Sequence, residues 1–540
     1  MKLGRGSVIG VIVLFLGVHA MAISTVTVSP GNLQRVEYWG VWASDNRPDW
    51  GSDWVVSSQP KVLDALYNDL GVNLARISLD YTSYNETTGE LNQTNMGYLK
   101  THIQGFTSRG VGTYFMSVWT PPPSMKTRNT PSAVYWNNGV KENVSLRPDQ
   151  EDKYIQYVAS ALQWLKSNNV PLPYAFSLQN EPDYNPDYDG CVYDSIQYRR
   201  VLKKMRTHFD ANGLGAVKLM GPEGGGLGSS QTLLGKNFGS LDSDPEFNAA
   251  LGIIASHNYN SIYYIWADYF EKTEGFSWQN YYKSFQAGMN NRTQAIWMTE
   301  YCSENSASIQ WKYAPSNGDS VVQIFGVQKE GVNKYLIMDS EDNNYFLTEA
   351  QHFNSDLINM GATAWVRWGS WNNDLNKKDY PYLIRGTSTI DLAKTYQLYQ
   401  TIWTHATPGS YVRKVTTDDP HLIGDSLYGL VDLSAMVNEK HMVVVLVNRT
   451  DLVKNVQVQG LTGSAGELYQ MTKTSNMTKV STPAIASGRA SISLQAHSAS
   501  ILVTNQGVTN PTRTWREDLQ RYQENPGFFD FLGRNIGFNK

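Results

Sequence analysis

The stretch QEDKYIQYVASALQWLKSNNVPLPYAFSLQN, residues 150–180, places an amphipathic run directly before a short apolar run. The amphipathic run predicts a helix, because apolar residues recur every three to four positions, at Tyr154, Tyr157, Val158, Ala161, Leu162 and Leu165. The second run, PYAFSLQN (173–180), is almost continuously apolar, which predicts a strand buried on both faces. A helix followed by such a strand is the repeating unit of a parallel α/β fold.

The same unit recurs along residues 36–405. The predicted strands are residues 36–43, 72–79, 111–118, 173–180, 216–223, 251–258, 294–300 and 361–368. The predicted helices include residues 59–70, 150–169, 195–212, 278–290, 346–360 and 391–403. Eight strand–helix units predict an α/β protein of the (β/α)8 TIM-barrel class with enlarged loops.

A doubly wound open sheet is the structural alternative. Such a sheet normally carries a glycine-rich phosphate turn after its first strand, and WGVWASDN (39–46) is not one. The run Gly224-Gly225-Gly226 lacks the Lys-Ser/Thr of a phosphate loop. Both observations favour the barrel.

The pattern changes after residue 405. Short alternating runs such as HMVVVLVN (441–448), VQVQGL (456–461) and SASILVT (498–504) predict that residues 406–504 form a fused antiparallel β-sandwich side domain. Residues 23–35 have the same character, so we expect them to join the side domain as its N-terminal strand. Residues 505–540 are a polar tail with a late aromatic cluster, and no role is predicted for it.

The first 22 residues have the pattern of a signal peptide. Lys2 and Arg5 precede the apolar run VIGVIVLFLGV (8–18), and Ala20-Met21-Ala22 offers small residues for cleavage. We expect a secreted, extracellular protein with no membrane association after cleavage. An uncleaved anchor is the alternative, although the run is short for a bilayer span.

Charge and aromatic content narrow the class of partner. The 45 Lys and Arg against 49 Asp and Glu give a formal charge of −4, which argues against a nucleic-acid binder. The 16 Trp and 32 Tyr suit the apolar faces of sugar rings as well as a protein core. A monomer is the default expectation for a protein of this kind.

Functional side chains are expected where the barrel strands end, because (β/α)8 enzymes place their catalytic groups there. Glu181 and Glu300 each close an apolar run, and strands four and seven of a closed barrel face each other across its mouth. Such a pair suits a glycosidase: one carboxyl group protonates the leaving oxygen, and the other attacks the anomeric carbon or activates water. Asn180, directly before Glu181, would donate to the sugar 2-hydroxyl. The sequence contains no metal-ligand spacing such as His-Glu-x-x-His, so no metal or other cofactor is expected.

Several motifs resemble glycoside hydrolase family 30 in order and spacing, over most of residues 30–504. They are WTPPPSMKT (119–127), SLQNEPDY (177–184), YDGC (188–191), SHNY (256–259) and WMTE (297–300). The resemblance implies a retaining (β/α)8 glycosidase with a side β-domain, in which Glu181 is the acid/base and Glu300 the nucleophile. It also implies that Tyr259 hydrogen-bonds the nucleophile. Arg76, in LARISLD (74–80), would keep Glu300 ionised through its positive charge.

Other strand-end residues leave alternatives open. Trp119 and Trp368 are expected to stack on the sugar in the −1 subsite rather than to pack the barrel. His257 is either a substrate contact or a core residue, and Glu223 either binds substrate or supports its loop. Loop aromatics expected to line more distant subsites are Trp136, Tyr184 and Trp371.

Two further features lie near the predicted mouth. Cys191 and Cys302 both fall in predicted loops there, and either a disulfide or two buried thiols would fit. Residues 303–345 form a segment that is long for the family and is predicted to be a hairpin inserted over the cleft, where it would extend or block subsites.

The substrate prediction rests on the residues that make up the motifs. QNEPDY followed by Tyr-x-x-Cys resembles the xylanase branch of the family, which implies a secreted endo-β-1,4-xylanase with a xylan-type polysaccharide as its partner. Residues 368–382 contain two Lys and no Arg before Arg385, which argues against strict dependence on glucuronic acid. A β-1,6-glucanase or β-1,6-galactanase is the alternative within the family. A non-catalytic carbohydrate-binding barrel is the alternative outside it.

Overall fold

The computed structural model describes most of the chain. The described residues are 23–42, 59–235, 243–259, 285, 293–302, 345–376, 382–418, 433–448 and 452–506, with the backbone of four short strands between 309 and 338. The predicted signal peptide (1–22), most of the tail and, apart from Phe285, the predicted helix 278–290 lie outside them. Within this part of the chain, no helix combines the length and apolarity needed to cross a membrane.

Eight parallel strands close into a barrel in chain order. They are β2 (Tyr38–Trp42), β3 (Leu74–Ser78), β6 (Thr113–Ser117), β9 (Ala175–Ser177), β10 (Lys218–Gly224), β11 (Leu251–His257), β12 (Ala295–Tyr301) and β17 (Ala364–Arg367). Every neighbouring pair is parallel, including the closing pair β17 and β2. The predicted TIM barrel is confirmed: each predicted strand overlaps one of these eight, and only β10 and β12 extend past the prediction, each by one residue.

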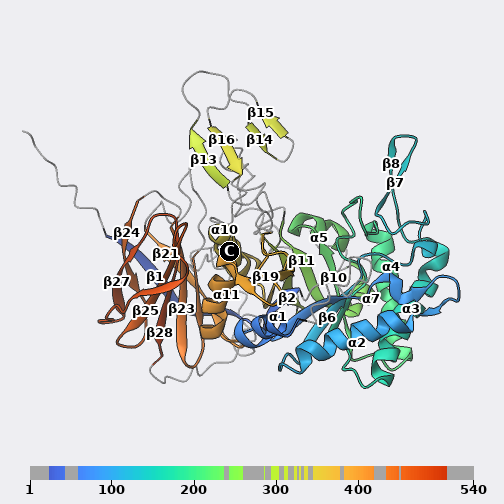
Figure 1. Cartoon of the computed structure of the whole chain (residues 1–540), viewed down its shortest axis with the longest axis horizontal. Helices are drawn as coiled ribbons and strands as arrows, with labels where there is room; N and C mark the ends of the chain where they lie inside the picture. The colour runs from blue at the N-terminus through green and yellow to red at the C-terminus, as the bar shows by residue number, and fades with distance from the viewer. Residues whose placement is uncertain are drawn as a thin grey trace, which may run out of the picture.

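Helices surround the barrel (Figure 1). They are α1 (Pro60–Asp64), α2 (Gln93–Thr107), α3 (Glu151–Ser167), α4 (Ser195–Ala211), α5 (Leu227–Leu234), α7 (Pro245–Ala250), α10 (Tyr345–Ser355) and α11 (Lys394–His405), and π-helical turns Ala65–Asp69 and Asp356–Met360 extend α1 and α10. Three of these helices begin at side-chain caps: Asn92 accepts from the backbone N–H of Thr94, Asp194 from that of Gln197, and Asp244 from that of Phe247.

The barrel interior is a separate apolar cluster from the layer beneath the helices. It consists of Leu74, Phe115, Ala175, Met220, Ile253, Ala255, Trp297, Ala364 and Val366. Because strand side chains alternate, the residues between these point outward to the helices. The filled interior makes the barrel a rigid platform, so the side chains at its mouth are held in fixed positions.

The side domain is one hydrogen-bonded sheet of nine strands. In spatial order these are β26 (Thr478–Ser481), β25 (Gly466–Thr472), β28 (Ser498–Asn505), β23 (His441–Asn448), β22 (Ser434–Val437), β21 (Tyr411–Thr417), β1 (Ser24–Arg35), β24 (Lys454–Gln459) and β27 (Arg489–Leu494). The sheet is mixed rather than wholly antiparallel, because β1 pairs antiparallel with β21 but parallel with β24. Strands β23 and β28 pack on α10 and α11, which fastens the sheet to the barrel (Figure 1).

Smaller strand pairs extend from the barrel loops. The hairpin β7 (Val134–Asn137) and β8 (Val140–Asn143) turns through Asn138 and Gly139, both with positive φ, as a two-residue hairpin requires. In the predicted insertion, β13 (Ile309–Tyr313) pairs antiparallel with β16 (Lys334–Met338), and β14 (Val322–Ile324) with β15 (Val327–Lys329). The strands β18 (Trp371–Asn372), β19 (Ile384–Gly386) and β20 (Ile390–Leu392) form a small sheet after the last barrel strand.

Candidate active site

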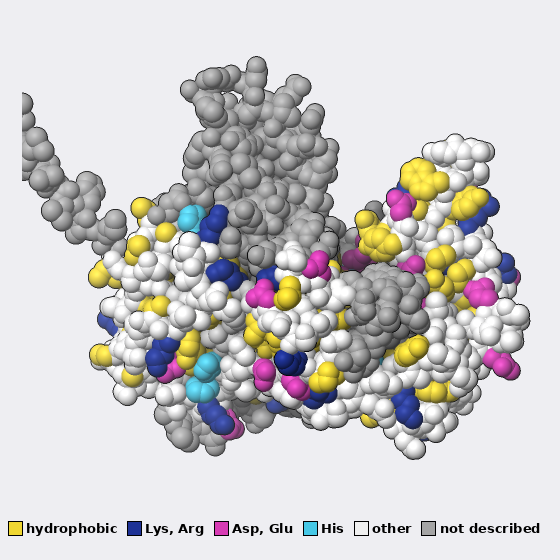
Figure 2. Space-filling view, viewed as in Figure 1, with side chains coloured by type: hydrophobic (Ala, Val, Ile, Leu, Met, Phe, Trp, Pro, Cys, Tyr) yellow, Lys and Arg dark blue, Asp and Glu magenta, His cyan; other side chains and the backbone are white. Residues whose placement is uncertain are grey.

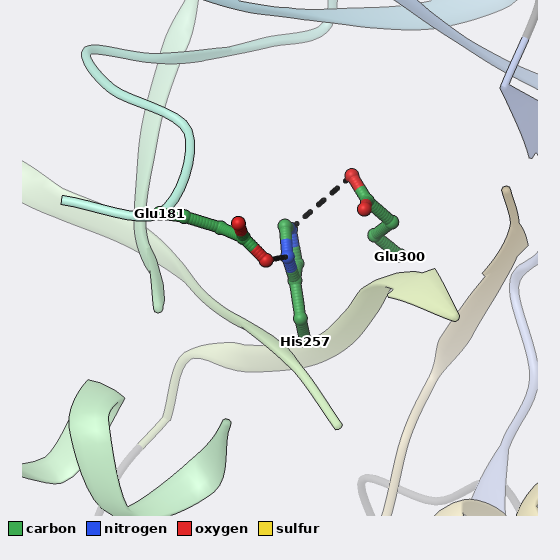
Figure 3. A group of neighbouring side chains, drawn as sticks. All are labelled: Glu181, His257 and Glu300. Atoms are coloured by element: carbon green, nitrogen blue, oxygen red, sulfur yellow. Dashed lines mark hydrogen bonds and ion pairs between the residues drawn. The ribbon is translucent and has the colours of Figure 1, made fainter. Parts of the chain in front are cut away.

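Side chains from six strands of the barrel meet at its C-terminal mouth. They are Arg76, Ser117, Asn180, Glu181, Glu223, His257, Tyr259 and Glu300. Figure 3 shows Glu181 and Glu300 on either side of the His257 ring. One oxygen of each carboxyl group and one nitrogen of the ring all lie within 4.8 Å of one another.

Arg76 is the fixed cation of the site. Its guanidinium is fully buried and ion-pairs with Glu300, and it also lies 3.1 Å from Glu223 Oε1 and donates to Asn180 Oδ1 at 2.6 Å. Burial lowers the pKa of Arg76, but the charges of Glu223 and Glu300 outweigh it and raise the pKa. Arg76 therefore keeps its charge and stabilises the anionic form of both carboxylates.

Glu223 is a buried anion behind the site. Ser117 Oγ donates to its Oε2 at 2.7 Å, and the residue has no exposed surface. Burial alone would raise its pKa, yet the positive charge of Arg76, with help from His257, lowers it to about 2. Of the two roles predicted for Glu223, the burial favours support of the site over direct contact with substrate.

His257 connects the carboxyl groups. Its Nδ1 lies 3.0 Å from Glu181 Oε1, and its Nε2 lies 3.8 Å from oxygens of Glu223 and Glu300. Burial lowers the pKa of His257, but the surrounding carboxylates, Glu300 first, raise it to about 9. His257 is thus a charged member of the site and not an apolar core residue.

The carboxyl group of Glu181 has a raised pKa. Burial raises the pKa of its carboxyl group, and the hydrogen bond from His257 only partly opposes this. Its backbone is held at φ 46° in the left-handed region, a conformation that side-chain-bearing residues rarely adopt, and its N–H donates to Glu223 O at 3.0 Å. Glu223 has the same kind of backbone, with φ 54°.

The glycines after β10 make room for this arrangement. A side chain at Gly224 would come within 2.9 Å of Ser230 and 3.1 Å of Asp183 Oδ1. The N–H of Gly225 donates to the same Asp183 oxygen at 3.0 Å, which fixes the loop that follows Glu181. The glycine run therefore serves close backbone packing beside the acid.

Tyr259 contacts the other carboxylate. Its hydroxyl donates to Glu300 Oε1 at 2.9 Å and lies 3.9 Å from Cys302 Sγ. Cys302 and Cys191 are both buried and are not joined by a disulfide, so of the two predictions for the cysteines, two buried thiols is the one observed. Burial raises the pKa of Cys191 to about 11, which makes it an unreactive thiol.

Three tryptophans form a wall beside Arg76. The Trp42 ring lies 4.5 Å from that of Trp119 and 4.7 Å from that of Trp368, and Arg76 lies 4.8 Å from the Trp119 ring. Trp119 and Trp368 are partly exposed, so they can also meet a ligand. Trp42 was not predicted as a site residue, although its position at the end of the first barrel strand could have indicated it.

The loop aromatics divide into two groups. The prediction for Trp371 is wrong: its ring is buried and its indole N–H donates to Gly386 O at 2.6 Å, within the small sheet after β17. Trp136 and Tyr184 are exposed, and Tyr184 lies beside Tyr188 with ring centres 6.5 Å apart. Figure 2 shows hydrophobic side chains gathered at the β7–β8 end of the molecule.

The spacing of Glu181, His257 and Glu300 would also suit a metal ion. However, Arg76 is already ion-paired to Glu300, and the raised pKa of His257 adds a second positive charge. Both charges oppose a divalent cation. The electrostatics therefore favour proton transfer and charge stabilisation over metal binding.

Comparisons with known proteins show a shared fold. No family model and no curated protein matches the sequence. A glycoside hydrolase family 30 subfamily 8 xylanase from Clostridium acetobutylicum is 21% identical with a TM-score of 0.61, over 89% of this chain and 99% of that one. The catalytic domain of a family 30 xylanase C from Talaromyces cellulolyticus is 16% identical (TM-score 0.61; 89% and 99%). An endo-β-1,6-glucanase is 15% identical (TM-score 0.54; 89% and 94%).

Proposed function

We propose that this protein is a retaining glycoside hydrolase related to family 30, with Glu181 as acid/base and Glu300 as nucleophile. The observation that carries the proposal is the close approach of the two carboxyl groups: one oxygen of Glu181 lies within 4.8 Å of one oxygen of Glu300. Retaining glycosidases hold these groups about 5–5.5 Å apart, whereas inverting enzymes leave about 6.5–9.5 Å for a water molecule.

The charges around the pair support a division of roles. Arg76 and the Tyr259 hydroxyl both contact Glu300 and stabilise its anion, as an attacking carboxylate requires. Glu181 has a raised pKa, as a proton donor at neutral pH requires. Exchanging the two roles would place the proton donor in contact with the positively charged Arg76.

The proposed reaction has two steps. Glu300 attacks the anomeric carbon while Glu181 gives its proton to the leaving glycosidic oxygen, which produces a covalent glycosyl ester. Glu300 then carries no charge, and because that charge helps to raise the pKa of Glu181, the pKa falls. Glu181 is thereby converted into a base, and it removes a proton from the water that hydrolyses the ester.

The favoured substrate is a xylan. Support comes from the sequence motifs and from the family 30 xylanases that share the fold over nearly their whole length. Arg385 is buried and donates to Asp391 Oδ2 at 2.8 Å, so its guanidinium is engaged within the protein, which supports cleavage that does not depend on glucuronic acid. A β-1,6-glucan is the second candidate, because an endo-β-1,6-glucanase also shares the fold.

A substrate screen tests the proposal. The purified protein is incubated with glucuronoxylan, arabinoxylan, a β-1,6-glucan and a β-1,6-galactan, and the products are separated by size. We expect a ladder of xylo-oligosaccharides that disappears in both Glu181→Ala and Glu300→Ala. Products from a 1,6-linked polymer alone would change the substrate, and bound polymer without any product would contradict the catalytic proposal.

A further inference from the structure

An exposed group of aromatic side chains stands next to the proposed acid. Trp136 on β7, and Tyr184 and Tyr188 in the loop after Glu181, have exposed fractions of 57%, 49% and 56%. We refer to these three residues as the aromatic platform. Large aromatic residues exposed together in this way mark binding surfaces, and their faces suit the C–H faces of sugars.

The two segments that carry the platform are fastened to each other. The N–H of Ala133 donates to Tyr188 O, and that of Gly190 donates to Pro131 O, both at 3.1 Å. Asn185 Nδ2 donates to Asn143 Oδ1 at 2.9 Å, which ties the loop to β8. The hairpin and the loop therefore form one unit, and the platform does not depend on two independently moving loops.

A buried lysine reinforces this unit from below. Lys126 Nζ donates to Pro131 O, Ser132 O and Gly190 O at 2.6–2.9 Å, and to the Thr120 hydroxyl at 2.8 Å. An ammonium group removed from water is costly unless it is fully hydrogen-bonded, as it is here. The lysine holds the hairpin and the loop together by their backbone carbonyls.

The ring of Trp136 is also oriented. Its indole Nε1 donates to Asp187 Oδ1 at 3.1 Å, so the polar edge is held while much of the ring remains exposed. Tyr135, the preceding residue on the strand, points to the opposite face of the hairpin, where Arg128 lies 5.0 Å from its ring. The hairpin thus offers Trp136, but not Tyr135, to the side that carries Tyr184.

The position of the loop indicates which side of the cleaved glycosidic bond the platform contacts. The N–H of Tyr184 donates to Glu181 O at 3.0 Å, so the platform begins one tight turn beyond the proposed acid. The acid must contact the glycosidic oxygen on the side of the leaving group. The tryptophan wall, by contrast, lies beside Arg76 and Glu300, where the sugar that forms the ester would be held.

From these observations we propose that the aromatic platform binds the leaving-group side of the polysaccharide, as the plus subsites of the enzyme. This inference rests on the proposed glycosidase function and on Glu181 as its acid. The occupant is a β-linked polymer chain that stacks sugar faces on Trp136 and Tyr184 as it leaves the cleavage point.

Two kinds of substrate distinguish effects on the plus subsites from effects on the minus subsites. The variants Trp136→Ala, Tyr184→Ala and their combination are assayed on the polymer and on a β-glycosyl fluoride of the matching di- or trisaccharide. Because its leaving group is a single fluoride ion, the glycosyl fluoride fills only the minus subsites. On the polymer, kcat/KM is expected to fall about 3- to 10-fold for each variant. On the glycosyl fluoride it is expected to stay unchanged.

Tyr135→Ala is the matched control, because it removes an aromatic ring of similar exposure from the other face of the same strand. It is expected to leave both activities unchanged. Equal losses on both substrates, or no loss on the polymer, would overturn the proposal. A loss in Tyr135→Ala equal to that in Trp136→Ala would also overturn it, since it would point to an unspecific effect on the hairpin.

A binding assay keeps this test separate from the catalytic proposal. In the Glu300→Gln background, retention in native gels containing soluble xylan or β-1,6-glucan reports polymer binding without turnover. Weaker retention after Trp136→Ala, but not after Tyr135→Ala, is expected even if the wild-type protein cleaves nothing. Retention unaffected by the platform variants would reject the platform whether or not the enzyme is active.

Discussion

Two buried arginine–glutamate sites lie at the C-terminal ends of barrel strands, and they differ in what surrounds them. Arg76 on β3 shares the inward face with Leu74, while Arg367 on β17 lies on the outward face, since Ala364 and Val366 point inward. Arg367 donates to Glu349 through Nε at 2.8 Å and through Nη2 at 2.6 Å, and the Tyr399 hydroxyl donates to the same carboxylate at 2.7 Å.

The difference lies in how completely the charges are paired. Glu349, on α10, receives a two-point ion pair from Arg367 on β17 and a third hydrogen bond from Tyr399 on α11, so its carboxylate is fully engaged. Arg76 is instead divided between Glu223, Glu300 and Asn180, and a third carboxyl group, Glu181, has a raised pKa beside them. Burial alone therefore does not distinguish a candidate catalytic ion pair from a structural one, whereas competition among several acids for one cation does.

Replacing each arginine by methionine should produce the largest difference in effect between the two sites. Both Arg76→Met and Arg367→Met remove one partner of a buried pair, so each should lower the free energy of unfolding by about 3–5 kcal/mol. Only Arg76→Met should also lower kcat, by about 10³-fold, because the proposed nucleophile and Asn180 lose their cation. Urea unfolding and initial rates at a temperature where both variants are folded provide the measurement.

If either methionine variant fails to fold, lysine at the same positions keeps the positive charge and tests the same contrast. Near-normal kcat in Arg76→Lys together with a strong loss in Arg367→Lys would contradict the account, since it would assign the catalytic charge to the outward site.

Removing one hydroxyl from each site should have a smaller effect. Tyr259→Phe deletes the hydrogen bond to Glu300, and Tyr399→Phe deletes the one to Glu349. A hydrogen bond to a charged group contributes about 1.5–3 kcal/mol, so kcat/KM in Tyr259→Phe should fall about 10- to 100-fold. Tyr399→Phe should instead lower the melting temperature and keep wild-type kcat/KM. The reverse pattern would show that Tyr399 acts on catalysis.

The smallest expected effect is a pH dependence of stability. The pKa of His257 is raised from 6.5 to about 9 in the folded protein, so the folded state retains a proton that the unfolded chain releases. Its contribution is fully present below pH 6.5 and is lost as the pH rises towards 9. His257→Gln should therefore reduce the fall in melting temperature over this range by a few degrees, while Tyr399→Phe should leave the fall unchanged. Identical slopes in His257→Gln and wild type would show that the histidine is neutral.

The barrel was predictable from sequence because its strands carry near-continuous apolar runs that only burial on both faces explains. The two catalytic candidates were predictable for a related reason, since Glu181 and Glu300 each interrupt such a run at its end. The helix α2 was missed: its buried Met96, Leu99, Ile103 and Phe106 have helical spacing, but polar residues and two glycines dilute the pattern.

The remaining features depend on contacts between distant segments. Arg76 and Glu300 are 224 residues apart, and the support role of Glu223 follows only from its burial between Arg76, Ser117 and His257. The left-handed backbone of Glu181 carries no local sequence signal. Trp371 was expected in a cleft loop and is buried instead, because β18 and β19 pair in a small sheet that no apolar run predicts.

Azide rescue tests the central claim most directly, because it assigns each carboxylate by the side of the sugar that azide can reach. With an activated aryl β-glycoside of the sugar released in the substrate screen, Glu300→Gly with azide should yield the α-glycosyl azide, formed in the space of the nucleophile. Glu181→Ala should yield the β-glycosyl azide, formed where the base would direct water. Exchanged anomers, or azide products from neither variant while the wild type is active, would contradict the assignment of Glu300 as nucleophile and Glu181 as acid/base.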